Sequence, residues 1–132
     1  MERIDQEDAE AYPFVGIFDC DGLNRGPINS ASILEAIRFL SEEPSRAAAP
    51  TNQRGFYYDI WALRHEAWCP GDCEQEYKTW YEMGFSHEAQ WARVGSRQVH
   101  IPPSAKPIEV KSGFGSFAVY KAEFLRGCRR FH

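Results

Sequence analysis

The chain has 132 residues, of which 43% are hydrophobic and 26% are charged, and its formal net charge is -4 at pH 7. This length suits one domain with a single core, and the composition is that of a soluble globular protein. The acidic balance argues against a nucleic-acid-binding protein, whose binding face is usually basic, and the sequence has no apolar run long enough to span a membrane.

Residues 1–12 are a polar leader, rich in acidic side chains and without a signal-peptide core. We therefore expect a cytoplasmic protein with a single domain over residues 13–132. In the cytoplasm, cysteines stay reduced rather than forming disulfides. The four cysteines are Cys20, Cys69, Cys73 and Cys128.

An uninterrupted apolar run over residues 13–18 predicts a buried strand in a central parallel sheet. Asp19 and Asp21 follow this run, one residue apart, before the turn residue Gly22. Side chains two apart on an extended backbone point the same way, so the two carboxylates would converge. They repel each other unless a divalent cation, with a phosphate on its far side, lies between them. The alternative is an ordinary aspartate-rich turn that closes the strand.

A helix is predicted after the next loop. Ser30 or Ser32 would cap it, and Glu35 fits a capping box with Ser32. Four apolar residues recur at helical spacing and predict one face packed on the core. They are Ile33, Leu34, Ile37 and Leu40. Pro44 ends this helix, and residues 46–50 fit either a short strand or a loop.

The rest of the chain alternates between predicted strands and helices. Residues 56–63 are a dense aromatic segment that predicts a strand turning into a short helix around Asp59. Asp72 is expected to cap a helix over 73–83, and a second helix follows over 86–94. The last predicted elements are a proline-rich loop, a strand that begins at 108–110, a strand over 117–120, and a short helix over 121–127. This alternation indicates an α/β fold.

The aromatic segment also carries chemistry. Asp59 could take a proton from a hydroxyl group within hydrogen-bonding reach, and Tyr58 and Trp61 could stack on a sugar or a base. The alternative is that Asp59 and Arg64 form a buried ion pair inside an aromatic core.

Gly113 and Gly115 lie one residue apart in a Ser-Gly-Phe-Gly-Ser segment. Two such glycines let backbone amides approach a ligand closely. The segment lacks the Gly-Lys-Ser/Thr end of a P-loop and the third glycine of a dinucleotide fingerprint. A tight connection between strands is therefore the alternative.

Cys69 and Cys73 are four residues apart and could share a helix face, with His65 and His87 nearby in the sequence. Such a set makes a zinc site conceivable. However, three residues separate the cysteines and no second pair follows, which departs from the usual zinc-ligand spacing. A zinc-binding structural domain is therefore the third of three hypotheses.

Four segments occur in a suggestive order. They are Asp-Cys-Asp-Gly-Leu-Asn at 19–24, Asn-Gln-Arg-Gly-Phe-Tyr-Tyr-Asp-Ile-Trp-Ala-Leu-Arg at 52–64, Trp-Cys-Pro-Gly-Asp-Cys at 68–73, and Ser-Gly-Phe-Gly-Ser-Phe-Ala-Val-Tyr-Lys at 112–121. In this order they resemble glycosyltransferases of the GT-A fold, especially fungal capsule-type mannosyltransferase-like proteins and their bacterial relatives. The resemblance implies an α/β fold, with a partial GT-A-like mixed sheet and flanking helices.

The resemblance also implies an activity: metal-dependent transfer of a sugar from a nucleotide-sugar donor to a hydroxyl acceptor. Asp19 and Asp21 would bind Mn²⁺ or Mg²⁺, and with Asn24 they would form the cofactor site. Asp59 would bind the acceptor or serve as the general base. The residues assigned to substrate binding are Tyr58, Trp61, Arg64, Gly113 and Gly115.

The resemblance covers the second half of such an enzyme. In the GT-A fold, several β/α units precede the Asp-x-Asp strand, whereas only thirteen residues precede Phe14. We therefore expect an incomplete domain that is inactive alone and that is completed by another chain or associates as a homo-oligomer. The second hypothesis is a non-catalytic module that binds carbohydrate or protein through the aromatic cluster.

Overall fold

The computed structural model describes residues 11–20, 29–52, 56–57 and 59–126. The chain divides into two compact units, unit 1 (Met1–Pro50 with Ser116–His132) and unit 2 (Thr51–Gly115). The elements are β1 (Phe14–Phe18), α2 (Ser30–Ser41), β2 (Ala48–Pro50), α3 (Cys73–Glu82), α4 (His87–Gly95), β3 (Phe117–Lys121) and α5 (Ala122–Leu125). The predicted combination of helices and strands is confirmed. Over the described ranges, no helix is both long enough and apolar enough to span a membrane.

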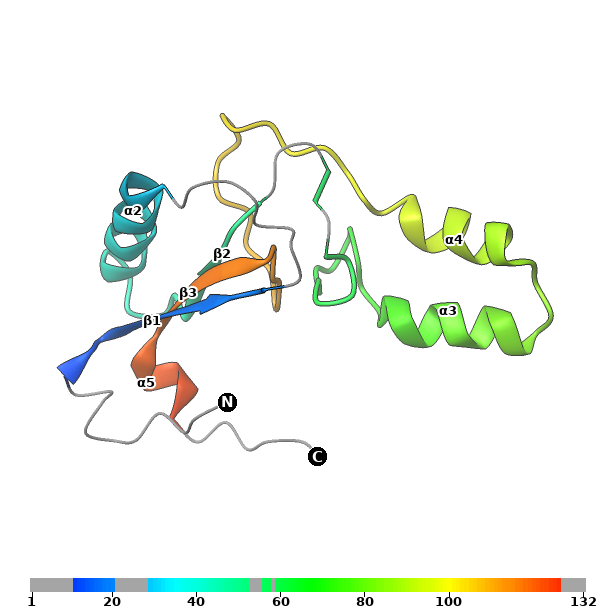
Figure 1. Cartoon of the computed structure of the whole chain (residues 1–132), viewed down its shortest axis with the longest axis horizontal. Helices are drawn as coiled ribbons and strands as arrows, with labels where there is room; N and C mark the ends of the chain where they lie inside the picture. The colour runs from blue at the N-terminus through cyan, green and yellow to red at the C-terminus, as the bar shows by residue number, and fades with distance from the viewer. Residues whose placement is uncertain (1–10, 21–28, 53–55, 58, 127–132) are drawn as a thin grey trace. The chain divides into compact units, whose positions relative to one another are not determined.

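Unit 1 is built on a small open sheet with the strand order β1-β3-β2 (Figure 1). Both strand pairs are antiparallel, and the register runs from Phe14 opposite Lys121 to Phe18 opposite Phe117. The prediction that residues 13–18 form a buried strand of a central parallel sheet is therefore wrong. In the described sheet β1 is an edge strand, and Gly16 and Phe18 are exposed. The reason is that a short apolar run does not reveal the direction of its partner.

Helix α2 forms where the apolar spacing predicted it, and Leu40 is fully buried. Its cap is Asn29, whose Oδ1 accepts a hydrogen bond from the backbone N–H of Ala31 at 3.0 Å. The predicted caps Ser30 and Ser32 are wrong because the helix already begins at Ser30. Leu34 is 67% exposed, so the packed face is narrower than predicted.

Two cations fix the C-terminal end of α2. The buried Lys121 donates from Nζ to the carbonyl oxygens of Glu43 at 2.8 Å and Pro44 at 3.0 Å. Arg46 donates from Nη1 to the carbonyl oxygen of Phe39 at 2.6 Å and covers the Phe39 ring. A helix end leaves carbonyl groups without helical partners, and Arg46 satisfies one of them. Lys121 holds the two residues that follow the helix cap. The chain then enters β2, which decides between the two alternatives for residues 46–50.

In unit 2, helices α3 and α4 lie side by side (Figure 1). Both predicted helices are confirmed, and Asp72 and Ser86 cap them by accepting backbone hydrogen bonds. The buried core of this unit lies mostly before and at the start of α3. It consists of Tyr57, Ile60, Leu63, Cys69, Cys73 and Val94.

Two predicted elements of unit 2 are absent from the described residues. Of residues 56–63, Phe56 makes only an isolated bridge with His100, and the chain then turns over 60–62. Residues 108–110 form no strand. Aromatic and β-branched residues favour strands only where a neighbouring strand is available, and here the aromatic side chains pack as a cluster instead.

Candidate functional site

Asp19 directly follows β1 and is half-buried. Its backbone N–H donates to the carbonyl oxygen of Ser116 at 2.9 Å, just before β3 begins. This contact brings Asp19 next to Ser116, the last residue of the Ser-Gly-Phe-Gly-Ser segment, within unit 1. Asp21 and Asn24, the other predicted cofactor residues, lie outside the described residues.

Ser116 has an unusual backbone conformation. Its φ angle is 69°, in the left-handed region, and its side chain is 1% exposed. A residue other than glycine is rarely found in this region, and such strained positions concentrate at binding and catalytic sites. The strained backbone therefore makes Ser116, whose carbonyl accepts a hydrogen bond from Asp19, a candidate functional position.

Gly115 is a glycine for a packing reason. It is buried, and a Cβ atom added there would overlap the backbone carbonyl oxygen of Thr51. The Thr51 hydroxyl also donates to the carbonyl oxygen of Gly115 at 3.0 Å. The close approach at Gly115 is thus made by the protein's own backbone. Gly113, the other predicted glycine, is half-buried in the same connection.

Asp59 lies in the turn that follows Tyr57. Its Oδ1 accepts a hydrogen bond from the backbone N–H of Ala62 at 3.2 Å, so one carboxylate oxygen holds the turn together. The alternative of an Asp59–Arg64 ion pair does not fit, because Arg64 forms its ion pair with Asp72. Tyr58, the predicted stacking partner, lies outside the described residues.

Arg64 is fixed in place by several contacts. Its Nη2 lies 2.9 Å from Oδ2 of Asp72, and its Nη1 donates to the carbonyl oxygens of Trp61 at 2.8 Å and Leu63 at 2.7 Å. Its backbone N–H donates to the carbonyl oxygen of Ser112 at 2.9 Å. The sequence did not predict the ion pair between Arg64 and Asp72. Asp72 was predicted only as a helix cap, and Arg64 only as part of the aromatic segment.

The aromatic segment and the glycine connection are joined inside unit 2. The Tyr57 hydroxyl accepts from the N–H of Phe114 at 3.0 Å and donates to the carbonyl of the same residue at 3.3 Å. The Ser112 hydroxyl donates to the carbonyl oxygen of Ala62 at 2.7 Å. The predicted substrate residues Trp61, Arg64 and Gly113 thus belong to two segments that lie next to each other.

Trp61 belongs to an aromatic cluster with two residues of the helices. Its ring centroid lies 6.1 Å from that of Tyr77 in an edge-on arrangement and 6.4 Å from that of Trp91 in a tilted one. Trp61 is 37% exposed and Trp91 is 44% exposed. Two neighbouring indoles that keep part of their surface accessible can stack on a sugar ring or another flat apolar face.

A thiol pair lies in the core of unit 2. The Sγ atoms of Cys69 and Cys73 are 2.8 Å apart, and both residues are fully buried. Burial, together with the hydrogen bond to Cys73, raises the pKa of the Cys69 thiol to about 11. Arg97 donates from Nη1 to Sγ of Cys73 at 3.0 Å and lies 2.6 Å from Oε2 of Glu76.

The histidines of the zinc hypothesis do not join these thiols. Nδ1 of His65 accepts from the backbone N–H groups of Ala67 and Trp68, and Nδ1 of His87 lies 3.3 Å from the Tyr77 hydroxyl. Within the part of the chain that the structure describes, no three His, Cys, Asp or Glu side chains come together as metal ligands.

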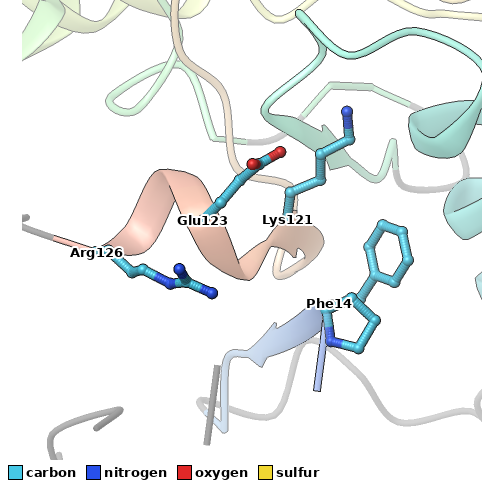
Figure 2. A pocket seen from close by; sticks show the side chains of 5 residues that line it. Phe14, Lys121, Glu123 and Arg126 are labelled. Atoms are coloured by element: carbon cyan, nitrogen blue, oxygen red, sulfur yellow. The ribbon is translucent and has the colours of Figure 1, made fainter. Parts of the chain in front are cut away.

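A surface hollow of about 290 Å³ lies in unit 1, beside α5 (Figure 2). Glu123 projects from α5, Arg126 from the residue that follows this helix, and Lys121 from the end of β3, while Pro13 and Phe14 complete the lining. Lys121 is already bonded to backbone carbonyls, as described above. Of the predicted site residues that the structure describes, none lines this hollow.

Comparisons with protein families, with curated proteins and with solved structures found no match for this chain. The functional interpretation therefore depends on the residues themselves and on the resemblance of the four segments.

Proposed function

We propose that the chain is a metal-dependent, glycosyltransferase-like domain that takes a sugar from a nucleotide-sugar donor and passes it to a hydroxyl acceptor. The observation that carries this proposal is the hydrogen bond from the Asp19 N–H to the Ser116 carbonyl. It joins two of the four segments on which the resemblance is based, at a buried residue with a strained backbone. Asp19 and Ser116, which belong to two of these segments, therefore also lie next to each other in unit 1.

The residue types assigned to the metal suit a hard divalent cation. Carboxylate oxygens, as in Asp19 and Asp21, and an amide oxygen, as in Asn24, are the kinds of ligand that Mg²⁺ and Mn²⁺ accept beside phosphate oxygens. When bound, the ion would neutralise charge on the leaving diphosphate. The half-buried position of Asp19 at a strand end favours ligand approach from one side.

In unit 2 we assign acceptor binding to the aromatic segment. The partly exposed Trp61 would stack on the acceptor sugar, and Asp59 would receive the proton of the attacking hydroxyl. The contacts of Arg64 hold the turn between these two residues in a fixed shape. A rigid support of this kind is what positions a binding residue accurately.

A thermal-shift titration tests the proposal. We expect Mn²⁺ and a nucleoside diphosphate together to raise the melting temperature more than the sum of their separate effects, because each supplies ligands for the other. Asp19→Asn combined with Asp21→Asn should abolish this joint effect. Glu35→Gln combined with Glu82→Gln removes the same charge from exposed positions and should leave the joint effect unchanged.

The exposed indoles favour a second candidate function, a non-catalytic module that binds carbohydrate or protein. Trp61 and Trp91 keep accessible surface while packing against each other. Such binding would need no metal, because stacking on an indole depends on apolar contact.

Trp61→Ala separates the two candidates when binding to a panel of immobilised glycans is measured. For the second candidate, binding persists in a metal chelator and is lost in Trp61→Ala. Tyr81→Ala is the control, since Tyr81 is 72% exposed on α3 and lies outside the Trp61 cluster. Dependence of the binding on metal would instead favour the transferase.

A further inference from the structure

The thiol pair of unit 2 plays no part in the proposed function, and its geometry leads to a separate inference. Cys69 and Cys73 are both 0% exposed, and their Sγ atoms lie 2.8 Å apart. The sulfur atoms of a disulfide are about 2.05 Å apart. A small adjustment of the two side chains would therefore be sufficient to bond them.

The backbone holds the two residues in place from both sides. The N–H and C=O groups of Cys69 exchange hydrogen bonds with those of His65, both at 3.0 Å, which closes a tight turn. Cys73 is the first residue of α3, and the Asp72 side chain caps that helix. Between them the chain is exposed, and a Cβ atom added at Gly71 would meet nothing within 4 Å. The linking residues can therefore adjust while the sulfur atoms bond.

The surroundings distinguish the two thiols. The guanidinium of Arg97 donates to Sγ of Cys73 at 3.0 Å. Cys69 has no such direct donor among the described side chains, and its burial favours the neutral thiol.

We propose that Cys69 and Cys73 form an intrachain disulfide by exchange with a small-molecule disulfide such as glutathione disulfide. One of the two cysteines, as its thiolate, attacks one sulfur of glutathione disulfide, which breaks the S–S bond and releases one glutathione. The other cysteine, on losing its proton, then attacks the Sγ atom of the first and releases the second glutathione. Two electrons pass from the cysteines to the oxidant, and the two thiol protons end on the two glutathione molecules.

Burial sets when this exchange happens and how long its product lasts. Both sulfur atoms are inaccessible in the folded unit, so the exchange takes place while unit 2 is folding. Once closed, the bond is shielded from thiol reductants until the unit opens.

Peptide mapping of the whole chain gives a direct test. Trypsin cleaves after Arg64 and Lys78 and has no site between them, so both thiols fall in one fragment, His65–Lys78. The chain is refolded with glutathione disulfide, exposed to dithiothreitol without denaturant, and then denatured and treated with iodoacetamide. We expect this fragment to be lighter than its reduced form by two hydrogen atoms and to take up no alkyl group.

A second sample, reduced in denaturant before alkylation, should instead carry two alkyl groups on the same fragment. Cys20→Ser, refolded in the same way, is the matched control and should give the same result for His65–Lys78. The inference is overturned if the fragment from refolded protein is fully alkylated without reduction in denaturant. It is also overturned if elemental analysis of the refolded protein finds stoichiometric metal that Cys69→Ser releases.

Discussion

At the scale of single residues, the molecule uses two of its unusual positions to hold backbone segments together. Gly115 lets the carbonyl of Thr51 approach where a side chain would collide. Ser116, the next residue, adopts a left-handed conformation and presents its carbonyl to the N–H of Asp19. The sequence predicted that Gly115 allows a ligand to approach the backbone. In the structure this glycine instead has a packing role in unit 2.

Gly115→Ala is expected to lower the free energy of unfolding by about 3 kcal/mol, the upper range for overpacking a site that cannot expand. The obstacle is backbone, which cannot move aside as a flexible side chain can. Chemical denaturation followed by tryptophan fluorescence measures the change. Gly71→Ala is the control, because nothing lies within 4 Å of its added Cβ, and it should change stability by less than about 0.5 kcal/mol. Equal effects of the two variants would contradict this explanation.

Asp72 caps helix α3 and forms an ion pair with Arg64, and substitutions can separate these two roles. Its hydrogen bonds from the N–H groups of Gln75 and Glu74, with the charge of Arg64, hold the pKa of its carboxyl below the ordinary value of 3.8. Asp72→Ala loses the cap and the ion pair, and should cost about 1 kcal/mol at neutral pH. Asp72→Asn keeps a capping side chain and should cost less.

The pH dependence of Asp72→Ala follows from the lowered pKa. A carboxyl whose folded pKa is depressed stabilises the fold above its unfolded pKa, and this stabilisation disappears as the pH falls through the folded value. The difference in the free energy of unfolding between the original chain and Asp72→Ala should therefore be constant above about pH 5 and should shrink below pH 3.8. Denaturation at a series of pH values measures it, and a gap that widens on acidification would contradict the assignment.

At the scale of elements, the α3–α4 pair is joined by one carboxylate between two arginines. Glu76 of α3 accepts from Nε of Arg93 on α4 at 2.8 Å and lies 2.6 Å from Nη1 of Arg97, which follows α4. Burial raises the pKa of Glu76, but the hydrogen bonds from these two arginines outweigh it and hold the pKa below 4.5. The carboxylate therefore stays charged at neutral pH.

Glu76→Ala should destabilise the chain by about 2 kcal/mol, since it removes charge-assisted hydrogen bonds that are only partly exposed. The loss should be full above pH 4.5 and should fade as the pH drops through the lowered pKa of Glu76, where the original chain also loses the charge. Lys78→Ala, which breaks the exposed Lys78–Glu74 pair on α3, is the control and should leave the stability almost unchanged. Equal costs would contradict a linking role for Glu76.

The elements also show how far the sequence could predict the fold. Helices α2, α3 and α4 were predictable because their signals are local: apolar spacing for α2, and the caps Asp72 and Ser86 for the other two. The strand that pairs with β1 was not predictable, because β3 lies far along the chain and only tertiary packing brings the two strands together. The same limit applies to Arg64, whose ion pair with Asp72 depends on a turn that the predicted strand and helix did not contain.

At the scale of the whole molecule, unit 2 is a continuous segment that separates the two parts of unit 1 in the sequence. Its two ends meet, because the Thr51 hydroxyl donates to the Gly115 carbonyl. An inserted unit with adjacent ends can fold without distorting the chain that carries it. The residues assigned to the metal and diphosphate belong to unit 1, and those assigned to the acceptor belong to unit 2, so the two halves of the proposed activity can be tested separately.

Electron paramagnetic resonance of Mn²⁺ tests the metal assignment most directly, because the signal of the free ion weakens when protein binds it. We predict that the chain weakens the signal strongly only when a nucleoside diphosphate is present, beyond the effect of the nucleotide alone. Asp19→Asn with Asp21→Asn should restore the signal to that of the nucleotide mixture, whereas Glu35→Gln with Glu82→Gln should not. A signal that the original chain leaves unchanged, or that the Asp19 and Asp21 variant weakens equally, would contradict the assignment.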